Sequence, residues 1–198
     1  MPFSSPLGLV LASSSSYRRI LLDRLGLGFN VCPAELDETP LPGEAPQAVA
    51  RRLASAKARA IAPRFPNHLI IGSDQVATLD DITILGKPST HENAVAQLGR
   101  LSGQRACFYT ATCLFNSCTN VLRAAMVPTV VEFRPLSHTT IEAYLHRERP
   151  YDCTGSAKIE GLGIALVRKV VSDDPSALIG LPLIALQDML EAEGVFVV

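Results

Sequence analysis

The residues best suited to chemistry include an aspartate that directly follows a hydrophobic segment. Leu69-Ile70-Ile71 and a glycine precede Asp74, so we expect its carboxylate to project from the end of a central strand, where open α/β sheets place ligands. A buried carboxylate must be paired, bound to a metal or raised in pKa, because an isolated buried charge is costly. Asp74 is therefore a candidate site residue, with a turn cap or a structural ion pair as the alternative.

Four serines, a tyrosine and two arginines open the first expected helix, in the stretch ASSSSYRR. Arg18 and Arg19 oppose the helix dipole there, because free N–H groups give the first turn a partial positive charge. A bound anion would reverse this penalty, and residues 13–16 supply short hydroxyls and accessible N–H groups. The stretch therefore predicts a phosphate-binding turn, with a serine cap followed by solvated arginines as the alternative.

Three further charged residues could complete such a site. Lys57 lies near the hydrophobic stripe of the second expected helix, where its ammonium needs a partner or must extend to water. Lys87 follows a glycine and precedes a proline, in a stiff turn that a ligand could approach closely. Glu38 suits a hard cation such as Mg²⁺ if it faces Asp74, although acidic loops are often only solvated.

Other polar residues carry weaker signals. Gln75 and Glu160 could present hydrogen-bonding groups to the edge of a base. The four histidines fall at no metal-ligand spacing, and the chain has no G-x-S-x-G elbow and no Rossmann or Walker glycine pattern. The residues therefore indicate neither a hydrolytic triad nor a common dinucleotide fold.

Composition limits the class of protein. The 198 residues are enough for one sizeable domain, and 47% hydrophobic with 19% charged residues is ordinary for a globular protein. The net charge of −1 provides no basic field for nucleic acid or an anionic membrane. Five cysteines without a C-x-x-C pair favour free thiols in a reducing compartment. With no leader or membrane-spanning segment recognised, we expect a cytoplasmic protein.

Hydrophobic periodicity predicts alternating strands and helices. Strands are expected at 9–12, 29–32, from 68 onwards, 82–85, 106–115, 121–133 and 164–170. Helices are expected around Leu21 to Leu25, at 45–62, 90–101 and 137–146, and from Pro182 as a first helical position. This pattern, with a long hairpin inserted, predicts an α/β fold with a mixed sheet, in a single domain over residues 1–198 with a short tail at 1–8.

A series of motifs runs along almost the whole chain: LASSSSYRRILL, DETP, RLASAKA, IGSDQVATL, GKP, LSGQRACFYTA, VEFRPLS, CTGSAKIEGLG and LIGLPLIAL. They occur in the order found in the Maf-like nucleotide pyrophosphatases. The chain resembles this family from about Leu9 to the last helix. The resemblance implies a two-lobed domain with a mixed, elongated, twisted sheet flanked by helices, similar to the fold of inosine triphosphatase. SYRR, SDQV and IEG resemble the 7-methyl-GTP branch rather than the dTTP/UTP branch, which tends to have threonine after the aspartate.

The resemblance implies an enzyme that uses water and a divalent cation, Mg²⁺, Mn²⁺ or Co²⁺, to cut a nucleoside triphosphate between its α and β phosphates. It implies that Asp74 is the general base and, with Glu38, a metal ligand. The implied phosphate-binding residues are Ser13, Arg18, Arg19, Lys57 and Lys87. The implied base-selecting residues are Tyr17, Gln75 and Glu160. Thr154 and Ala157 depart from the family's alanine and aromatic pattern at the base pocket.

Three functions stay open at this point. The first is pyrophosphatase activity on 7-methyl-GTP, and the second is the same reaction on a dTTP/UTP or ITP/XTP type of substrate. The third is a nucleotide-binding regulator of cell division without turnover. For partners, we expect the nucleotide, no nucleic acid, no membrane and, as in many members of the resembled family, a homodimer.

Overall fold

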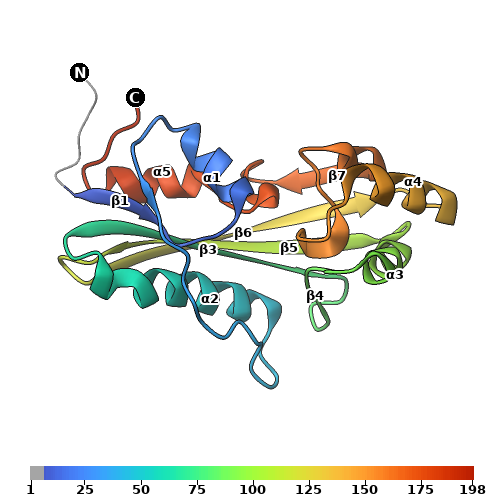
Figure 1. The fold of residues 1–198 in the computed structure, drawn as a ribbon, viewed down its shortest axis with the longest axis horizontal. Helices are drawn as coiled ribbons and strands as arrows, with labels where there is room; N and C mark the ends of the chain where they lie inside the picture. Colours follow the sequence, from blue (N-terminus) through green and yellow to red (C-terminus); the bar gives the residue numbers. More distant parts are fainter. Residues whose placement is uncertain (1–6) are drawn as a thin grey trace.

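The computed structural model describes residues 7–198 and is built around one seven-stranded sheet (Figure 1). The strands are β1 (Gly8–Leu11), β2 (Asn30–Val31), β3 (His68–Thr78), β4 (Ile84–Leu85), β5 (Arg105–Asn116), β6 (Val121–Phe133) and β7 (Val167–Ser172). Their order is β2-β1-β3-β5-β6-β7, with β4 paired to β3 outside this path. The sheet is mixed, as expected, because β1 runs parallel to β2 and β3 whereas the other pairs are antiparallel.

Five α-helices flank this sheet. They are α1 (Ser16–Asp23), α2 (Pro46–Ile61), α3 (His91–Leu101), α4 (His138–Glu148) and α5 (Leu183–Glu191). Helix α2 covers one face, α1 and α5 lie on the other side near β1, and α3 and α4 lie at the far end (Figure 1). Separate hydrophobic clusters fill the two ends of this elongated arrangement. Among the described residues, every helix is too short or too polar to cross a membrane.

Hydroxyl side chains begin three of these helices. Ser15 accepts a hydrogen bond from the backbone N–H of Arg18, and Thr90 and Ser137 cap α3 and α4 in the same way. Such caps satisfy N–H groups that lack partners within the helix. One serine of the ASSSS run is thus a cap, and the other serines are left for other contacts.

The partners of β3 change along its length. β1 pairs only with its first four residues, His68 to Ile71, whereas β5 pairs with it from Leu69 to Thr78. β4 pairs with β3 only from Ala77, so the edge of β3 between Ile71 and Ala77 has no neighbouring strand on that side. We refer to this interval as the notch. Asp74 lies in the notch, within β3; the expectation that it ends the strand is wrong, because β5 keeps β3 extended beyond the end of β1.

A glycine sets the distance between α2 and β3. A Cβ atom placed on Gly72 would lie 2.1 Å from the backbone oxygen of Ala54, so only glycine allows the helix to pack this closely. Lys57 lies three residues beyond Ala54 on α2, and Asp74 lies two residues beyond Gly72 on the same face of β3. The close contact therefore brings Lys57 to Asp74.

Three element boundaries differ from the sequence-based expectations. The strand expected at 164–170 begins at Val167, because the preceding segment forms a 3-10 helix, Leu162–Leu166, in which Gly163 packs on the backbone of Lys158. The strand expected at 82–85 is shortened to Ile84–Leu85, because Asp80 accepts hydrogen bonds from the N–H groups of the turn before it. Pro182 has an extended backbone and caps α5 rather than starting it.

The expected N-terminal tail at 1–8 falls mainly outside the part of the chain that the structure describes. Residues 1–6 lie outside the described residues, and Gly8 already belongs to β1.

Candidate active site

A cavity of about 300 Å³ opens at the notch. The serine turn before α1, the loop before α2, α2 itself, β3 and the loop after β4 supply its walls. Most of the predicted site residues line this cavity: Ser13, Arg18, Glu38, Lys57, Asp74, Gln75 and Lys87. The structure therefore brings together residues that are far apart in the sequence.

Lys57 and Asp74 form an ion pair on the floor of the cavity. Lys57 Nζ lies 2.6 Å from Asp74 Oδ1 and 2.8 Å from Glu38 Oε1. Lys57 and Asp74 are each only 7% exposed, so the alternative of a lysine that extends to water is wrong. Asp74 lines the cavity, and its Oδ2 has no hydrogen-bond partner among the described residues. This oxygen is available to a water molecule or a cation.

Burial and charge act on Asp74 in opposite directions. Burial raises the pKa of Asp74, and the positive charges of Lys57 and Arg18 partly oppose this rise. A carboxylate with a raised pKa is a stronger base than an exposed aspartate. The environment of Asp74 thus suits a group that accepts a proton from water.

The donor set of this cavity fits a hard divalent cation. Asp74 Oδ1 and Glu38 Oε1 both contact the ammonium of Lys57, which leaves the second carboxylate oxygen of each residue for a cation. Magnesium prefers oxygen ligands and is usually bound by one or two carboxylates together with waters and substrate phosphates. The side chain of Glu38 is 55% exposed, so it has room to turn toward a bound cation.

Arg18 is fixed at the start of α1 by two hydrogen bonds. Its Nε donates to the backbone oxygen of Gly180 at 2.8 Å, and its Nη1 donates to Ser13 Oγ at 3.2 Å. Burial lowers the pKa of Arg18, and the carboxylates of Asp74 and Glu38 oppose this effect. Nη2 has no hydrogen-bond partner within residues 7–198. The guanidinium is therefore held in place with donor capacity remaining for a phosphate oxygen.

The two remaining cations differ in position. Lys87 is exposed on the loop after β4 and lines the cavity, and its ammonium has no ion-pair or hydrogen-bond partner among the described residues. Arg19 is exposed on α1 and does not contribute to the cavity wall. Successive helix residues point in directions about 100° apart, so Arg18 and Arg19 cannot face the same ligand equally. Phosphate binding by Arg19 stays a prediction.

A second cavity of about 90 Å³ adjoins the first. The two share lining residues from the α1 turn, β3, the Lys87 loop and the 151–157 loop: Ser15, Arg18, Gln75, Lys87 and Thr154. The predicted base-selecting residues Tyr17, Gln75 and Glu160 all line this second cavity, as does Ala157. Thr154 and Ala157, which depart from the family pattern, are thus part of its wall.

Sequence reasoning missed Asp152, which also lines the second cavity. The hydroxyl of Tyr17 donates to Asp152 Oδ1 at 3.2 Å, and Cys153 Sγ lies 3.6 Å from the same hydroxyl. Lys158 Nζ lies 5.7 Å from the centre of the Tyr17 ring. The acidic residue just before the CTGS motif was the available signal, but a surface loop gives no indication in sequence of the residue it will contact.

The side chain of Gln75 is oriented by contacts with β5 and with the 3-10 helix Ala177–Ile179. Its Nε2 donates to Thr110 Oγ1 at 2.9 Å and to the backbone oxygens of Ala177 and Leu178 at 3.1 and 3.0 Å. The amide nitrogen is therefore fully used within the protein. Its carbonyl oxygen Oε1 is the group left for a ligand, and it can only accept hydrogen bonds.

Comparison with known proteins gives one family. The sequence profile described as Maf-like protein matches residues 8–193. The 7-methyl-GTP pyrophosphatase of Methylobacillus flagellatus is 56% identical over 190 residues, covering 96% of this chain and 98% of the relative. The proteins of the same name from Nitrosospira multiformis and Nitrosococcus oceani are 56% and 52% identical, covering 96% and 98% of this chain and 96% and 97% of their own lengths.

A solved nucleoside-triphosphatase / dITP/XTP pyrophosphatase from Mycobacterium abscessus gives only a weak likeness. It has a TM-score of 0.42 at 14% identity, over 72% of this chain and 95% of that chain. The profile match and the close relatives do not depend on this likeness. The chain belongs to the Maf-like protein family.

Proposed function

We propose that this protein hydrolyses the α-β phosphoanhydride of 7-methyl-GTP, releasing the nucleoside monophosphate and pyrophosphate. The observation that carries the proposal is the buried Asp74, which faces a cavity lined by Lys57, Arg18 and Lys87. This cavity adjoins a smaller one whose wall includes Tyr17, Asp152 and Glu160, with Arg18 and Lys87 shared between the two. The relatives named 7-methyl-GTP pyrophosphatase support the choice of substrate.

We assign each side chain of the cavity a separate role in hydrolysis. Asp74 Oδ2 accepts a proton from the attacking water, and the ion pair from Lys57 to Oδ1 holds the carboxylate in position. Arg18 and Lys87 bind the phosphate oxygens, on which negative charge is concentrated during the reaction. A divalent cation held by Glu38 and Asp74 would add Lewis-acid stabilisation of the same oxygens.

The smaller cavity suits a cationic base. Methylation at N7 gives guanine a positive charge, and Asp152, which accepts from the Tyr17 hydroxyl, and Glu160 supply carboxylates to the wall of this cavity. The ammonium of Lys158, which pairs with Glu148, already takes the cation position over the Tyr17 ring, so compensation of the base charge is assigned to the two carboxylates. The free Gln75 Oε1 can accept from a base N–H group. We therefore place the methylated base in the smaller cavity, with its charge compensated by Asp152 and Glu160.

A nucleotide panel with a pyrophosphate readout tests this function. The purified protein should release pyrophosphate from 7-methyl-GTP in the presence of Mg²⁺, Mn²⁺ or Co²⁺, with lower kcat/KM for GTP, dTTP, UTP, ITP and XTP. Asp74→Asn should lose at least about a hundredfold in kcat, because it keeps the shape of the side chain but removes the base. Asp173→Asn, an exposed residue outside both cavities, is the matched control and should keep full activity.

Two variants test the proposed recognition of the nucleobase. Asp152→Asn and Glu160→Gln each remove one negative charge with little change in size, so each should lower the ratio of kcat/KM for 7-methyl-GTP over GTP. If both variants keep this ratio unchanged while the enzyme remains active, Asp152 and Glu160 do not determine the preference for the methylated base. If nucleotides bind tightly with every metal but no pyrophosphate appears, the protein is a nucleotide-binding regulator instead.

Three broader expectations accompany the proposal. The enzyme is expected to act in the cytoplasm on a free nucleotide, without nucleic acid or membrane. A homodimer is expected by resemblance to its family. Sedimentation of the purified protein, with and without nucleotide, measures the oligomeric state.

A further inference from the structure

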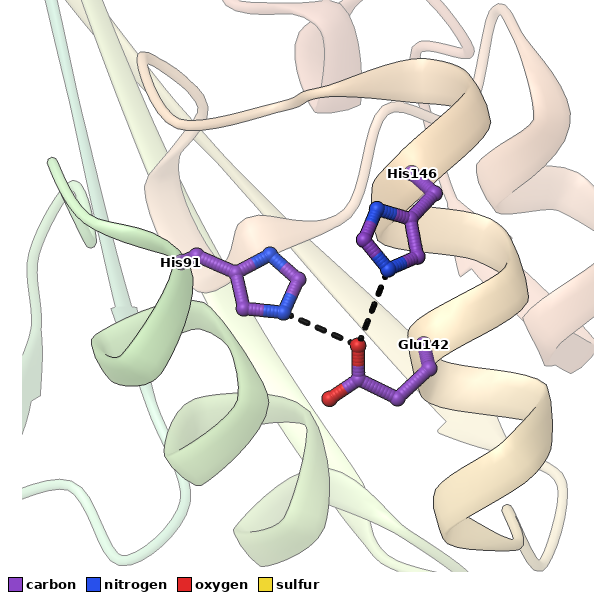
Figure 2. Close-up of side chains that lie close together, drawn as sticks. All are labelled: His91, Glu142 and His146. Carbon is purple, nitrogen blue, oxygen red and sulfur yellow. Dashed lines mark hydrogen bonds and ion pairs between the residues drawn. The ribbon is translucent and has the colours of Figure 1, made fainter.

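Three of the four histidines in the chain surround one glutamate, Glu142, away from both cavities. His138, Glu142 and His146 occupy successive turns of α4, and His91 is the first residue of α3. His91 Nε2 lies 2.9 Å and His146 Nε2 lies 3.5 Å from Glu142 Oε2. Figure 2 shows both rings directed at this one carboxylate oxygen from different helices.

The spacing of these atoms is close to that of a metal site. One ligand atom from each of His91, Glu142 and His146 can be chosen so that all lie within 4.8 Å of one another. Zinc bonds of about 2.0–2.2 Å in a tetrahedron place neighbouring ligand atoms about 3.3 Å apart. The separations of 2.9 and 3.5 Å from Glu142 Oε2 lie on either side of this value, and side-chain rotation would set the spacing of the two imidazoles, whose ring centres are 5.3 Å apart.

The ring of His91 is also held by a contact at Nδ1, the nitrogen that does not face Glu142. Its Nδ1 lies 3.0 Å from the hydroxyl of Tyr151, which can either donate or accept a hydrogen bond. A metal-bound histidine usually donates its second N–H to such a partner, which fixes the ring and leaves the other nitrogen for the metal. Tyr151 therefore supplies an outer contact that an ordinary surface ion pair does not require.

The ligand types select the class of cation. Two imidazoles and one carboxylate suit zinc and similar transition metals, whereas Mg²⁺ prefers an all-oxygen set such as Asp74 with Glu38. We propose that His91, Glu142 and His146 form a zinc site with His138 beside it. The fourth ligand position would go to water or to His138, whose Nε2 lies 3.7 Å from Glu142 Oε1.

The proposed site runs against the expectation that the histidines have no metal-ligand spacing. The residues at 138, 142 and 146 follow one another at intervals of four, which places them on one face of a helix. A bound ion would join α3 to α4. Through Tyr151, whose backbone oxygen accepts from the N–H of Ser89 at 3.0 Å, it would also support the loop that carries Lys87.

Zinc titration of the untagged, metal-free protein tests the proposal. Excess Mg²⁺ is included to saturate sites built from oxygen ligands. We expect one equivalent of Zn²⁺ by equilibrium dialysis, a visible Co²⁺ spectrum of tetrahedral type, and a rise in Tm of about 5 °C at a hundredfold excess over Kd. Absence of zinc binding to the wild-type protein would overturn the proposal.

Matched histidine variants locate the site. His91→Gln/His146→Gln should lose the zinc equivalent and the Tm rise, while His68→Gln, which removes the fourth imidazole elsewhere, should keep both. His146 has a side chain that is 73% exposed, so the single variant His146→Gln should fold and still bind zinc at least tenfold more weakly. Tyr151→Phe should weaken binding about tenfold. Zinc binding that is unchanged in the double variant would place the metal elsewhere.

The zinc proposal is independent of the proposed hydrolysis. Asp74→Asn should retain the full zinc equivalent although it lacks activity. Loss of zinc in Asp74→Asn, with retention in the histidine double variant, would assign the ion to the nucleotide cavity and refute the second site.

Discussion

The ammonium of Lys57 and the carboxylate of Asp74 meet 2.6 Å apart, one from a helix and the other from the middle of a strand. Each group lowers the cost of burying the other, because an unpaired buried charge is strongly destabilising. The pair also sets how readily Asp74 gives up its proton, since Lys57 partly offsets the effect of burial on the pKa of Asp74. Structure and reactivity of this carboxylate thus depend on the same contact.

Replacing Lys57 should therefore shift the pH dependence of activity. Asp74 must be deprotonated to act as a base, so kcat/KM rises with pH, with a midpoint above the ordinary aspartate value of 3.8. Lys57→Met removes the charge that lowers the pKa of Asp74, so the midpoint of the rise in kcat/KM should move to higher pH. Lys87→Met is the control: it should raise KM without moving the pH midpoint of kcat/KM, because Lys87 does not contact Asp74. If the pH midpoint of kcat/KM is the same in Lys57→Met as in the wild type, the ion pair does not control the protonation of the catalytic base.

Gly72→Ala tests the close packing that brings the pair together. The added methyl group would lie 2.1 Å from the backbone oxygen of Ala54, and backbone must move to relieve the overlap. We expect a loss of roughly 1–3 kcal/mol in the free energy of unfolding, measured by urea denaturation, together with reduced kcat. Gly99→Ala is the matched control, because Gly99 lies in α3 with open space around it. That variant should be neutral or stabilised by up to about 1 kcal/mol.

Arg52→Lys tests the loop that carries Glu38. Arg52 contacts both carboxylate oxygens of Glu44 at 2.7 Å and the backbone oxygen of Thr39 at 3.2 Å, which fastens this loop to α2. Lysine cannot reproduce the two parallel contacts. The variant should need several-fold more Mg²⁺ for half-maximal activity with little change in kcat at saturating metal. Arg51→Lys, at an exposed neighbouring position, should leave the metal requirement unchanged.

Glu44 gives the same loop a defined acid sensitivity. The hydrogen bond from Arg52 lowers the pKa of Glu44 from 4.5 to about 2. Since this pKa is depressed in the folded state, the contact stabilises the fold above pH 4.5, and this contribution is lost as the pH falls toward 2. The Tm difference between wild type and Glu44→Gln should therefore shrink over that interval. A difference that is constant with pH would show that the carboxylate charge does not hold the loop.

The neighbouring arginines of α1 should behave differently. Arg18 lines both cavities and is fixed by Gly180 and Ser13, whereas Arg19 is exposed outside them. Arg18→Ala should reduce kcat/KM by two to three orders of magnitude, through loss of charge stabilisation on the phosphates. Arg19→Ala should reduce it by less than about threefold, as expected for a solvated charge. Equal losses in steady-state assays of the two variants would show that Arg19 also reaches the substrate.

The sequence allowed a good part of this site to be predicted. The cost of placing arginines at a helix start pointed to a phosphate-binding turn, and the apolar run before Asp74 pointed to a buried carboxylate. The sequence could not show that Lys57 reaches Asp74, because that contact depends on the packing at Gly72. Asp152 and the place of His91 beside Glu142 were missed for a related reason: their partners come from other segments, and only the fold brings those segments together. The spacing of His138, Glu142 and His146 was visible in the sequence as intervals of four.

The contact between Arg18 and Gly180 has a consequence for how the protein folds. These residues are 162 positions apart in the chain, whereas β5 and β6 are joined by a short hairpin. Contacts between distant segments form late, because the entropy of closing a large loop must be met first. We therefore expect the β5–β6 hairpin to form early, and the substrate cavity to be completed only when the segment before α5 docks. A chain released before that segment is synthesised would lack the anchor of Arg18.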